Sequence, residues 1–519
     1  MSSEITTVPN VAPGVDARGR ARLLSIATIA AIGLLPLVLL APFVNAPFER
    51  DEAVYATVAR GLLDGAVPYR DLFDHKPPFV HLWYALSFVA FGESVVAPRI
   101  MAALFYSGTA LAVFAQARLL FDRPTALAAG LATGATAGLV MLRAVANVEV
   151  FTILPMTLAL LAATLGFRSD QPRAWRWFAA AGLLSAVAVL TKQVALLPTA
   201  AIGIVIVLNG ERRIRNGGAF ASAGVATLVV VVLPFVAVGA FDDWFYANVT
   251  YNLLYFRADG PGPVSSTLTF LVAAAPLVLL AAVGARSIAR TTGGAPRWLL
   301  ALWVAAIFAT VLTTGRAYAH YWVLTVPALG LLAAPALVAI GSVPRLTIPR
   351  RVAVWTALIL ATALAVAVNL PPYLAGSSAD RHVVQYGTAG DRDVEAAAVA
   401  DRVGELLEGR EGAIYELGRE TSIYFYATRQ PPVRFMFDRQ FYLDPATLEE
   451  AISGLRVNPP ELILLTRAAD DPPYSDGSVP IAVVSERLVP PPVVALLDEE
   501  YQFVERIEFA DIYRLVPAR

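Results

Sequence analysis

Two adjacent acids, Asp51 and Glu52, come directly after the first long apolar run of the chain. They open a segment in which Val54, Val58 and Leu62 recur every four residues, a spacing that predicts an amphipathic helix lying along a membrane surface. An aspartate at this depth can act as a general base that removes the proton of an acceptor hydroxyl beside the membrane. Asp51 can equally be the cap of that helix, and the sequence leaves both interpretations open.

A third acid, Glu149, stands at the outer end of a later apolar segment. A carboxylate that enters a membrane span is costly in free energy and usually functional, so we expect Glu149 to face the same cavity as the first two acids. The alternatives are a helix cap or an ion pair with Arg143. The candidate catalytic carboxylates are therefore Asp51, Glu52 and Glu149.

Four cations lie on the same predicted side of the membrane as these acids. Lys192 is the clearest case because it is the only charged residue between Phe178 and Asn209. A buried ammonium needs an anion, which a lipid phosphate at the outer leaflet or a carboxylate of the first loop would supply; a structural ion pair is the alternative. If a phosphate balances the charge, Lys192→Met should leave stability unchanged or slightly raised. The candidate donor-phosphate ligands are Lys76, Lys192, Arg316 and Arg99.

Two histidines with polar neighbours complete the set of candidates, His75 beside Asp74 and His320 beside Tyr321. Asp74, His75 and His320 together could bind a divalent metal ion, although their spacing matches no metal signature. A lone histidine near a membrane interface is more often a structural hydrogen-bonding residue. We expect these residues to give polar support to the site, with no firmly bound cofactor and a divalent metal ion as the alternative.

The composition indicates the setting of these residues. Of the 519 residues 57% are hydrophobic and 16% charged, and the charges are sparse before residue 375 and dense after it. This distribution predicts a polytopic membrane domain followed by a water-soluble one. The net charge of -1 gives no sign of nucleic-acid binding, and the lack of cysteine excludes disulfides and thiol catalysis. The first apolar run is followed by no cleavage pattern, so we expect it to be retained as a span.

A spanning helix needs about 20 mostly apolar residues. The predicted spans are roughly 22–44, 97–117, 124–142, 150–167, 176–190, 193–209, 219–240, 265–285, 297–314, 322–341 and 352–371. The run 78–92 is short, follows two prolines and contains His81. If it does not cross, every arginine cluster between spans falls on one face, as the preference of arginine and lysine for cytoplasmic loops requires. We therefore expect 78–92 to lie in the interface and about eleven helices to cross.

This topology predicts a multi-pass cell-membrane protein with a cytoplasmic amino terminus and an extracytoplasmic carboxy-terminal domain. The predicted division is a cytoplasmic tail (1–21), a membrane domain (22–375) with its first outer loop at 45–96, and a soluble domain (376–519). In the soluble domain, strand-like runs at 412–417 and 462–466 alternate with helices, which predicts a small α/β fold with a mostly parallel sheet. No glycine-rich phosphate loop occurs there, so we expect this domain to have no catalytic role of its own.

Five motifs carry a family resemblance through their order of appearance. They are RDE (50–52), DHKPP (74–78), GESVVAPR (92–99), LTKQ (190–193) and GRAYAHYWVLTVPAL (315–329). Over roughly residues 20–370 the chain resembles the GT-C glycosyltransferases. More narrowly, it is similar to the dolichyl-phosphate-mannose-protein mannosyltransferase-like group, which includes the bacterial aminoarabinose transferases that modify lipid A and the lipopolysaccharide-core transferases of rhizobia.

The resemblance implies an integral membrane enzyme that transfers a hexose or pentose from a polyprenyl-phosphate donor, with its active site on the extracytoplasmic side. The acceptor would be a hydroxyl of a protein, a lipid or a cell-envelope glycan, and direct displacement would invert the anomeric centre. The matching positions are Asp51 as the base with Glu52 beside it, Lys76 and Lys192 toward the donor phosphate, and Glu149 where aspartate is commoner. The family's metal-site residues match only partially, through Asp74 or His75.

Two other functional classes compete with this interpretation. A transporter or flippase of a lipid-linked sugar would be expected to show internal repeats and charges at the midplane, whereas this chain shows no repeat and its unusual charges collect at one face. A non-catalytic subunit of a polysaccharide assembly complex would use the soluble domain as a docking surface. The sequence chooses neither the sugar nor the acceptor.

Overall fold

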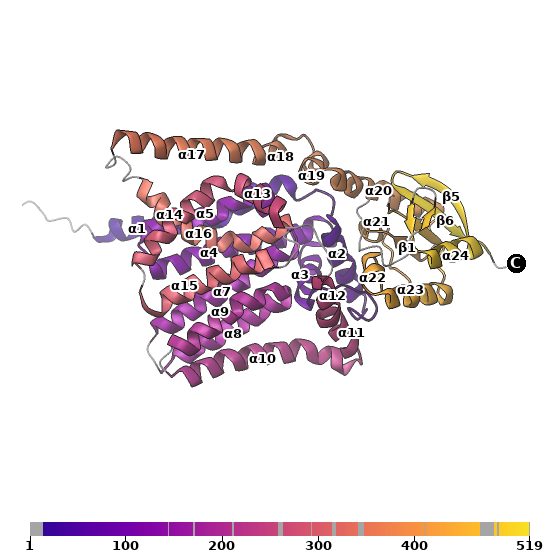
Figure 1. Cartoon of the computed structure of the whole chain (residues 1–519), viewed down its shortest axis with the longest axis horizontal. Helices are drawn as coiled ribbons and strands as arrows, with labels where there is room; N and C mark the ends of the chain where they lie inside the picture. The colour runs from indigo at the N-terminus through magenta and orange to yellow at the C-terminus, as the bar shows by residue number, and fades with distance from the viewer. Residues whose placement is uncertain are drawn as a thin grey trace, which may run out of the picture.

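Long apolar helices form one end of the molecule and a small sheet forms the other (Figure 1). The computed structural model describes residues 14–143, 145–169, 172–209, 212–257, 263–291, 293–313, 318–340, 347–410, 412–467, 482–484 and 487–517. The carboxy-terminal part of the chain, from Pro371 onward, is called the tail below. It packs against the end of the helical bundle that carries α2 (Arg50–Leu63), α3 (Pro78–Phe91), α11 (Phe241–Phe245) and α12 (Tyr251–Arg257) (Figure 1).

Eight helical segments in the described part of the chain are long and apolar enough to cross a membrane. They are α1 (Gly14–Leu40), α4 (Val96–Leu120), α7 (Val148–Arg168), α8 (Ala174–Thr191), α10 (Arg213–Ala237), α15 (Gly294–Thr313), η5 with α16 (Ala319–Thr325 and Val326–Ala339) and α17 (Ile348–Asn369). The outer helices α10 and α17 expose apolar side chains such as Val230 and Ile359, a pattern suited to lipid rather than water. The chain is therefore a multi-pass membrane protein.

The three remaining predicted spans are irregular. The segment 124–142 is built from α5 (Arg123–Ala135), η2 (Thr136–Gly138) and α6 (Val140–Arg143), and 193–209 from η3 (Gln193–Ala195) and α9 (Leu196–Asn209). The prediction of a single helix over 265–285 is wrong. That segment is a pair of helices, α13 (Pro263–Ala273) and α14 (Ala275–Thr291), bent by 88°. Pro276 lies just after the break, where its missing N–H and its ring disfavour a continuous helix.

The doubtful run 78–92 forms α3 (Pro78–Phe91), which ends at Gly92 with a φ of +83°. Its 14 residues rise only about 21 Å, less than the roughly 30 Å hydrocarbon core of a bilayer. At the opposite end of the bundle, Arg123 donates a hydrogen bond to Ser25 (3.2 Å) and Arg168 to the carbonyl of Leu119 (2.7 Å). These contacts bring residues from three of the predicted arginine-bearing turns to one end of the bundle.

The tail contains a four-stranded sheet in the order β1-β2-β6-β5. Its strands are β1 (Ile414–Leu417), β2 (Leu462–Leu465), β5 (Tyr501–Ile507) and β6 (Ala510–Leu515); β3 (Ala482–Val484) and β4 (Arg487–Val489) form a separate pair. The tail helices are α18 (Pro371–Leu374), α19 (Ser378–Tyr386), α20 (Thr388–Leu406), α21 (Ser422–Tyr426), α22 (Arg439–Leu443), α23 (Pro445–Val457) and α24 (Pro491–Glu500). The expectation of a mostly parallel sheet is wrong: only β1 and β2 are parallel, because the β5–β6 hairpin adds two antiparallel strands.

The tail is packed directly onto the segment predicted as the first outer loop (45–96), which contains α2 (Arg50–Leu63). The Tyr426 hydroxyl accepts a hydrogen bond from the backbone N–H of Phe48 (2.9 Å), and the N–H of Phe73 donates to the carbonyl of Arg434 (2.8 Å). The buried Arg60 donates to the carbonyl of Phe425 (3.0 Å), and its guanidinium lies 4.2 Å from the centre of that ring. The loop that carries the candidate site is therefore held between the bundle and the tail.

Candidate functional site

The first turn of α2 shows which acid caps this helix. Glu49 is the N-cap: its carboxylate accepts a hydrogen bond from the N–H of Asp51 (3.0 Å), and the Glu52 carboxylate accepts one from the N–H of Glu49 (3.1 Å). This reciprocal pair is a capping box. The interpretation of Asp51 as the cap is therefore wrong, and its side chain is available for another role.

The Asp51 carboxylate is half-buried and makes no hydrogen bond or ion pair with the residues that the structure describes. Burial alone would raise its pKa, but nearby charges, that of Lys76 first, hold the pKa below its usual value. Asp51 is therefore an ionised and chemically free carboxylate beside a cation. Both properties are required of a general base at neutral pH.

Glu52 and Arg99 form a buried ion pair, with Oε2 2.7 Å from Nη2. The other oxygen of Glu52 accepts a hydrogen bond from the N–H of Ala146 (2.8 Å), and Arg99 also donates to the carbonyls of Ala46 and Pro47. These contacts join the start of the outer loop, α4 and the segment before α7. Because the two charges satisfy each other, the geometry favours a bracing role for both over a role in proton transfer or phosphate binding.

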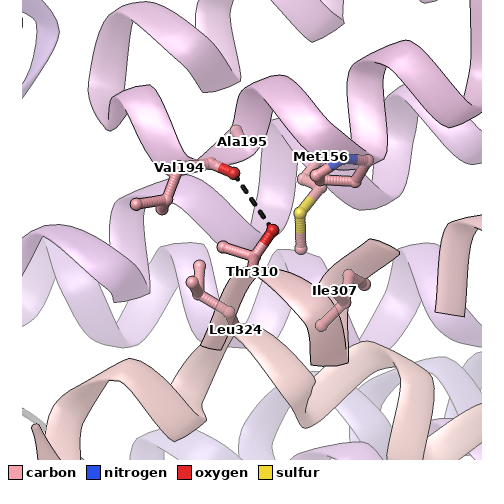
Figure 2. Close-up of a pocket in the computed structure, with 7 residues that line it drawn as sticks. Met156, Val194, Ala195, Ile307, Thr310 and Leu324 are labelled. Carbon is pink, nitrogen blue, oxygen red and sulfur yellow. Dashed lines mark hydrogen bonds between the residues drawn. The ribbon is translucent and has the colours of Figure 1, made fainter. Parts of the chain in front are cut away.

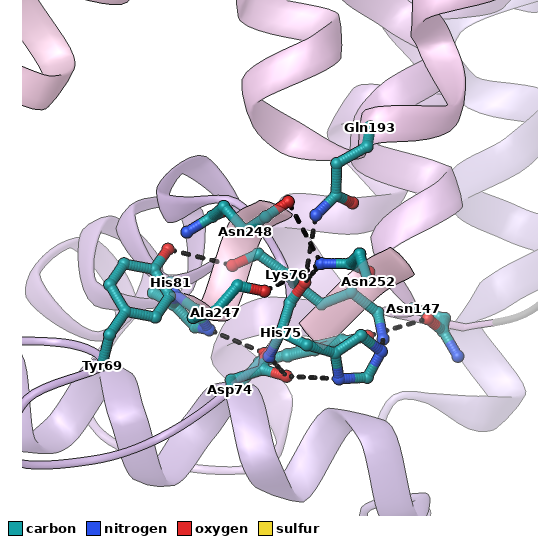
Figure 3. Close-up of polar contacts among 11 residues, drawn as sticks. Tyr69, Asp74, His75, Lys76, His81, Asn147, Gln193, Ala247, Asn248 and Asn252 are labelled. Carbon is teal, nitrogen blue, oxygen red and sulfur yellow. Dashed lines mark hydrogen bonds and ion pairs between the residues drawn. The ribbon is translucent and has the colours of Figure 1, made fainter. Parts of the chain in front are cut away.

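The segment Asp74–Lys76 lies at the centre of a polar network that several elements hold in place (Figure 3). The carbonyl of His75 accepts hydrogen bonds from Gln193 (3.0 Å) in η3 and from Asn252 (2.9 Å) in α12 (Tyr251–Arg257). The carbonyl of Lys76 accepts one from the Tyr69 hydroxyl (2.9 Å). The backbone of this segment is therefore fixed, so its side chains have defined directions.

Within the segment, the side chains form a chain of contacts. One oxygen of Asp74 lies 2.9 Å from Nε2 of His81, and the other accepts the His75 N–H (2.6 Å) and lies 3.4 Å from Nδ1 of the His75 ring. Nε2 of His75 lies 2.7 Å from the ammonium nitrogen of Lys76. A carboxylate, an imidazole and an ammonium thus follow one another in sequence and in space.

The charges of this chain follow from its surroundings. Burial and the charge of Lys76 lower the pKa of His75 to about 3, so its ring is neutral. For Asp74, burial acts to raise the pKa, but the hydrogen bond from His81 and the charge of Lys76 lower it well below the usual range. Burial acts to lower the pKa of Lys76, yet Asp51 and Asp74 raise it. Lys76 is therefore a stable cation at neutral pH.

Glu149 and Lys192 form a second, fully buried ion pair through Oε1 and Nζ. Glu149 lies in the first turn of α7, and Lys192 is the extended residue between α8 and η3. The Lys192 ammonium is also 3.9 Å from the centre of the Tyr321 ring, and Nε2 of His320 is 3.7 Å from the same Glu149 oxygen. The anion that balances Lys192 in this structure is a carboxylate of α7 and not one of the first loop.

The alternatives considered for Glu149 are wrong. Asn147 caps α7, accepting a hydrogen bond from the N–H of Val148 (2.7 Å). Arg143 instead donates to Gln385 of the tail (2.8 Å). The remaining oxygen of Glu149 is buried with no hydrogen-bond partner among the described residues.

Several contributors to the site carry no recognisable sequence signal. The ring of Tyr255 stacks on His75 with centres 5.0 Å apart, and the guanidinium of Arg439 lies 4.6 Å from the centre of the Tyr255 ring. Asn252 and Gln193 bind the loop backbone as described above. Gln193 alone had a signal, because it lies in the LTKQ motif; Tyr255 and Arg439 could be found only from the folded structure. The tail thus approaches the site through α22.

Two predicted features, a phosphate ligand at Arg316 and a metal site, are not seen among the described residues. Arg316 lies outside the described residues. The described histidine, aspartate and glutamate side chains include no group of three or more arranged to hold a metal ion. Instead, Asp74 and His75 point along the chain of contacts above, and His320 approaches Glu149.

Beneath the site, the bundle is closely packed. A narrow gap between α7, α9, α15 and η5 is lined mainly by apolar side chains, among them Met156, Ile307 and Leu324 (Figure 2). It leaves no room for a water molecule, and Thr310 bridges it by a hydrogen bond to the carbonyl of Val194 (3.4 Å). The charged residues of the site therefore lie against a closely packed, apolar part of the bundle.

Comparison with known proteins gives this architecture a family context. Residues 75–237 match the family model described as dolichyl-phosphate-mannose-protein mannosyltransferase. A search of curated protein sequences found no match. Among solved structures, the chain is similar to ArnT from Cupriavidus metallidurans bound to undecaprenyl phosphate, with 17% identity, a TM-score of 0.58 and coverage of 97% of this chain and 99% of that one.

Two further solved structures share the architecture. The apo oligosaccharyltransferase of Archaeoglobus fulgidus has 12% identity and a TM-score of 0.51 over 84% of this chain and 69% of that one. The arabinofuranosyltransferase AftD from Mycobacteria has 14% identity and a TM-score of 0.50 over 94% of this chain and 41% of that one. The predicted resemblance is confirmed: the chain has a GT-C fold, with a helical membrane bundle and a small tail.

Proposed function

We propose that this chain is a membrane glycosyltransferase that moves a sugar from a polyprenyl-phosphate donor to an acceptor hydroxyl at the tail end of the bundle. The observation that carries the proposal is Asp51, an ionised carboxylate without a hydrogen-bond partner among the described residues, in the electrostatic field of Lys76. The undecaprenyl phosphate bound to the similar ArnT structure supports a lipid phosphate as the leaving group. Further support comes from the arginine clusters, which favour an extracytoplasmic tail.

The proposed reaction is a single displacement. Asp51 accepts the proton of the acceptor hydroxyl as its oxygen attacks the anomeric carbon. The bond from that carbon to the phosphate oxygen breaks, and polyprenyl phosphate leaves with the electron pair, so the anomeric configuration inverts. Lys76 stabilises the negative charge that develops on the phosphate, and it does so most strongly where water is excluded.

The other charged residues support these two. Lys192, held by Glu149 and near His320, supplies a second positive charge on the bundle side of the site. Glu52 and Arg99 fix the start of α2 and thereby the position of Asp51. In this proposal they are positioning residues, whereas Asp51 alone touches the reacting atoms as a base.

The experiment compares Asp51→Asn with a matched control on the same helix. Purified protein is incubated with radiolabelled polyprenyl-phosphate hexoses and pentoses and with cell-envelope acceptors. Because Glu49 caps α2, Asp51→Asn should fold normally and retain donor binding, while transfer falls about 100- to 10,000-fold. Asp64→Asn, an exposed acid at the other end of α2, should transfer at the wild-type rate.

Two results would change the proposal. If Asp51→Asn turns over normally while Glu149→Gln is inactive, the base is Glu149. If both variants transfer sugar at the wild-type rate, the displacement mechanism is wrong.

A further inference from the structure

The tail helix α22 brings a cation, Arg439, to the edge of the site. This helix packs against α12 (Figure 1), and the Arg439 guanidinium lies 4.6 Å from the centre of the Tyr255 ring. That ring stacks on His75, whose Nε2 lies 2.7 Å from the ammonium nitrogen of Lys76. Two cations, one from the bundle and one from the tail, therefore contact the two rings of one stacked pair.

Arg439 is half-buried and has no acidic partner among the described residues. Its Nε is fully buried and has no hydrogen-bond partner there. Other arginines between bundle and tail are paired: Arg434, for example, contacts Asp243 at 2.6 Å. A guanidinium is always charged in proteins, and a charge held away from bulk water is costly unless an anion compensates it. The charge of Arg439 is therefore available to an anion that the chain does not supply.

The fold fixes the position of this arginine. The N–H of Asp438 donates to the carbonyl of Gly418 (2.9 Å), so α22 begins beside the carboxyl end of β1. Open α/β sheets commonly bind ligands at the carboxyl ends of their parallel strands. At the other end of α22, Asp444 accepts a hydrogen bond from the Tyr246 hydroxyl (2.6 Å). The helix that carries Arg439 is thus held on the segment that leads into α12.

The bundle side of the site offers little net positive charge for an anionic donor. Lys192 is already neutralised by Glu149. Asp74 and Lys76 contact the same imidazole, that of His75, so their opposite charges act on the same place. The ammonium groups of the bundle are therefore balanced by its own carboxylates, and an additional cation is needed to hold a phosphate.

We propose that Arg439 binds the phosphate of the polyprenyl-phosphate donor from the tail, together with Lys76. The inference rests on the proposed function and deepens it, because it gives the tail, for which no catalytic role was expected, a residue in the donor site. The donor phosphodiester carries one negative charge, whereas the phosphate monoester that leaves carries about 1.5–2 at neutral pH. A second cation therefore gains importance as the bond breaks. The planar guanidinium suits this role because it donates two parallel hydrogen bonds to phosphate oxygens.

The test is equilibrium binding of radiolabelled undecaprenyl phosphate to the purified full-length chain in nanodiscs. Arg439→Gln should raise the Kd about 10- to 100-fold through the loss of charge-assisted hydrogen bonds. Arg439→Lys keeps the charge but not the planar fork, so its Kd should rise less. Neither variant leaves an ion-pair partner behind among the described residues, so both should melt near the wild-type temperature. Arg456→Gln, an exposed arginine of α23, is the matched control and should keep the wild-type Kd.

Undecaprenol, which has the same chain and no phosphate, separates recognition of the phosphate from recognition of the lipid. Arg439→Gln should bind undecaprenol as the wild type does. Equal weakening for undecaprenol and undecaprenyl phosphate would overturn the inference, and so would wild-type Kd values for undecaprenyl phosphate in both Arg439 variants.

The proposed function can fail separately. If the wild type binds no undecaprenyl phosphate, the donor class of the proposed function is wrong and the inference falls with it. If the wild type binds undecaprenyl phosphate and Arg439→Gln binds it equally well, the inference alone is wrong.

Discussion

Replacing Lys192 by methionine should destabilise the protein strongly. In the structure its ammonium pairs with Glu149, whose side chain is completely buried and whose second oxygen has no hydrogen-bond partner among the described residues. Removing one partner of a buried ion pair typically costs about 3–5 kcal/mol, because the other charge is left uncompensated. The Tyr321 ring, now 3.9 Å from the ammonium, would also lose a cation–π contact worth about 0.5–2 kcal/mol, partly replaced by a sulfur–aromatic contact.

The assay is a double-mutant cycle on chemical unfolding in detergent. Lys192→Met alone should lower the free energy of unfolding by about 3–5 kcal/mol. Adding Glu149→Gln removes the stranded charge, so the double variant should recover much of this loss, with a coupling energy of about 0.5–3 kcal/mol. His320 lies 3.7 Å from the same carboxylate, and His320→Gln serves as the control because it leaves the ion pair intact.

Unchanged or increased stability in Lys192→Met would refute this reasoning. That result would favour the expectation from the sequence alone, in which a lipid phosphate balances Lys192. The structure reverses the expected sign because Glu149 already supplies the anion. Additive effects in the cycle would show that the two side chains do not interact in solution.

Three further outcomes are expected. The pKa of His75 falls on folding from the ordinary 6.5 to about 3. Between these two pH values the unfolded chain binds one more proton than the folded chain, so acid lowers the free energy of unfolding. Because His75→Gln lacks this group, its melting temperature should fall less than that of the wild type between about pH 7 and about pH 4. Arg60→Ala should destabilise the chain by about 2–4 kcal/mol in chemical unfolding and speed proteolysis of the tail, because it removes a charged hydrogen bond and a cation–π contact to Phe425, whereas the exposed Arg70→Ala should stay within about 0.5 kcal/mol. An alkaline phosphatase reporter fused after Arg519 should be active outside the cytoplasm, and activity of a cytoplasmic reporter in its place would contradict the predicted orientation.

The sequence by itself determined the membrane bundle and the regions that carry the site. The length of each apolar run decides which helices can cross the membrane, and the placement of arginine predicts on which side of the membrane each loop lies. Both therefore follow from composition along the chain. The shortness of 78–92 was predicted for this reason. A bend within an apolar segment cannot be predicted in this way. The hydropathy of 265–285 is the same whether the segment is one straight helix or the pair α13 and α14, which are bent by 88°.

Only the tertiary structure decided how the charges are paired. Asp51, Lys76 and Glu149 were predicted as site residues from residue type and position, but the sequence does not show which side chains surround them. Lys192 meets Glu149 across 43 positions, and the tail residue Arg439 reaches Tyr255. Whether a buried charge is free to react or already neutralised depends on which atoms lie within a few ångströms, because Coulomb energy depends on spatial distance and not on separation along the chain.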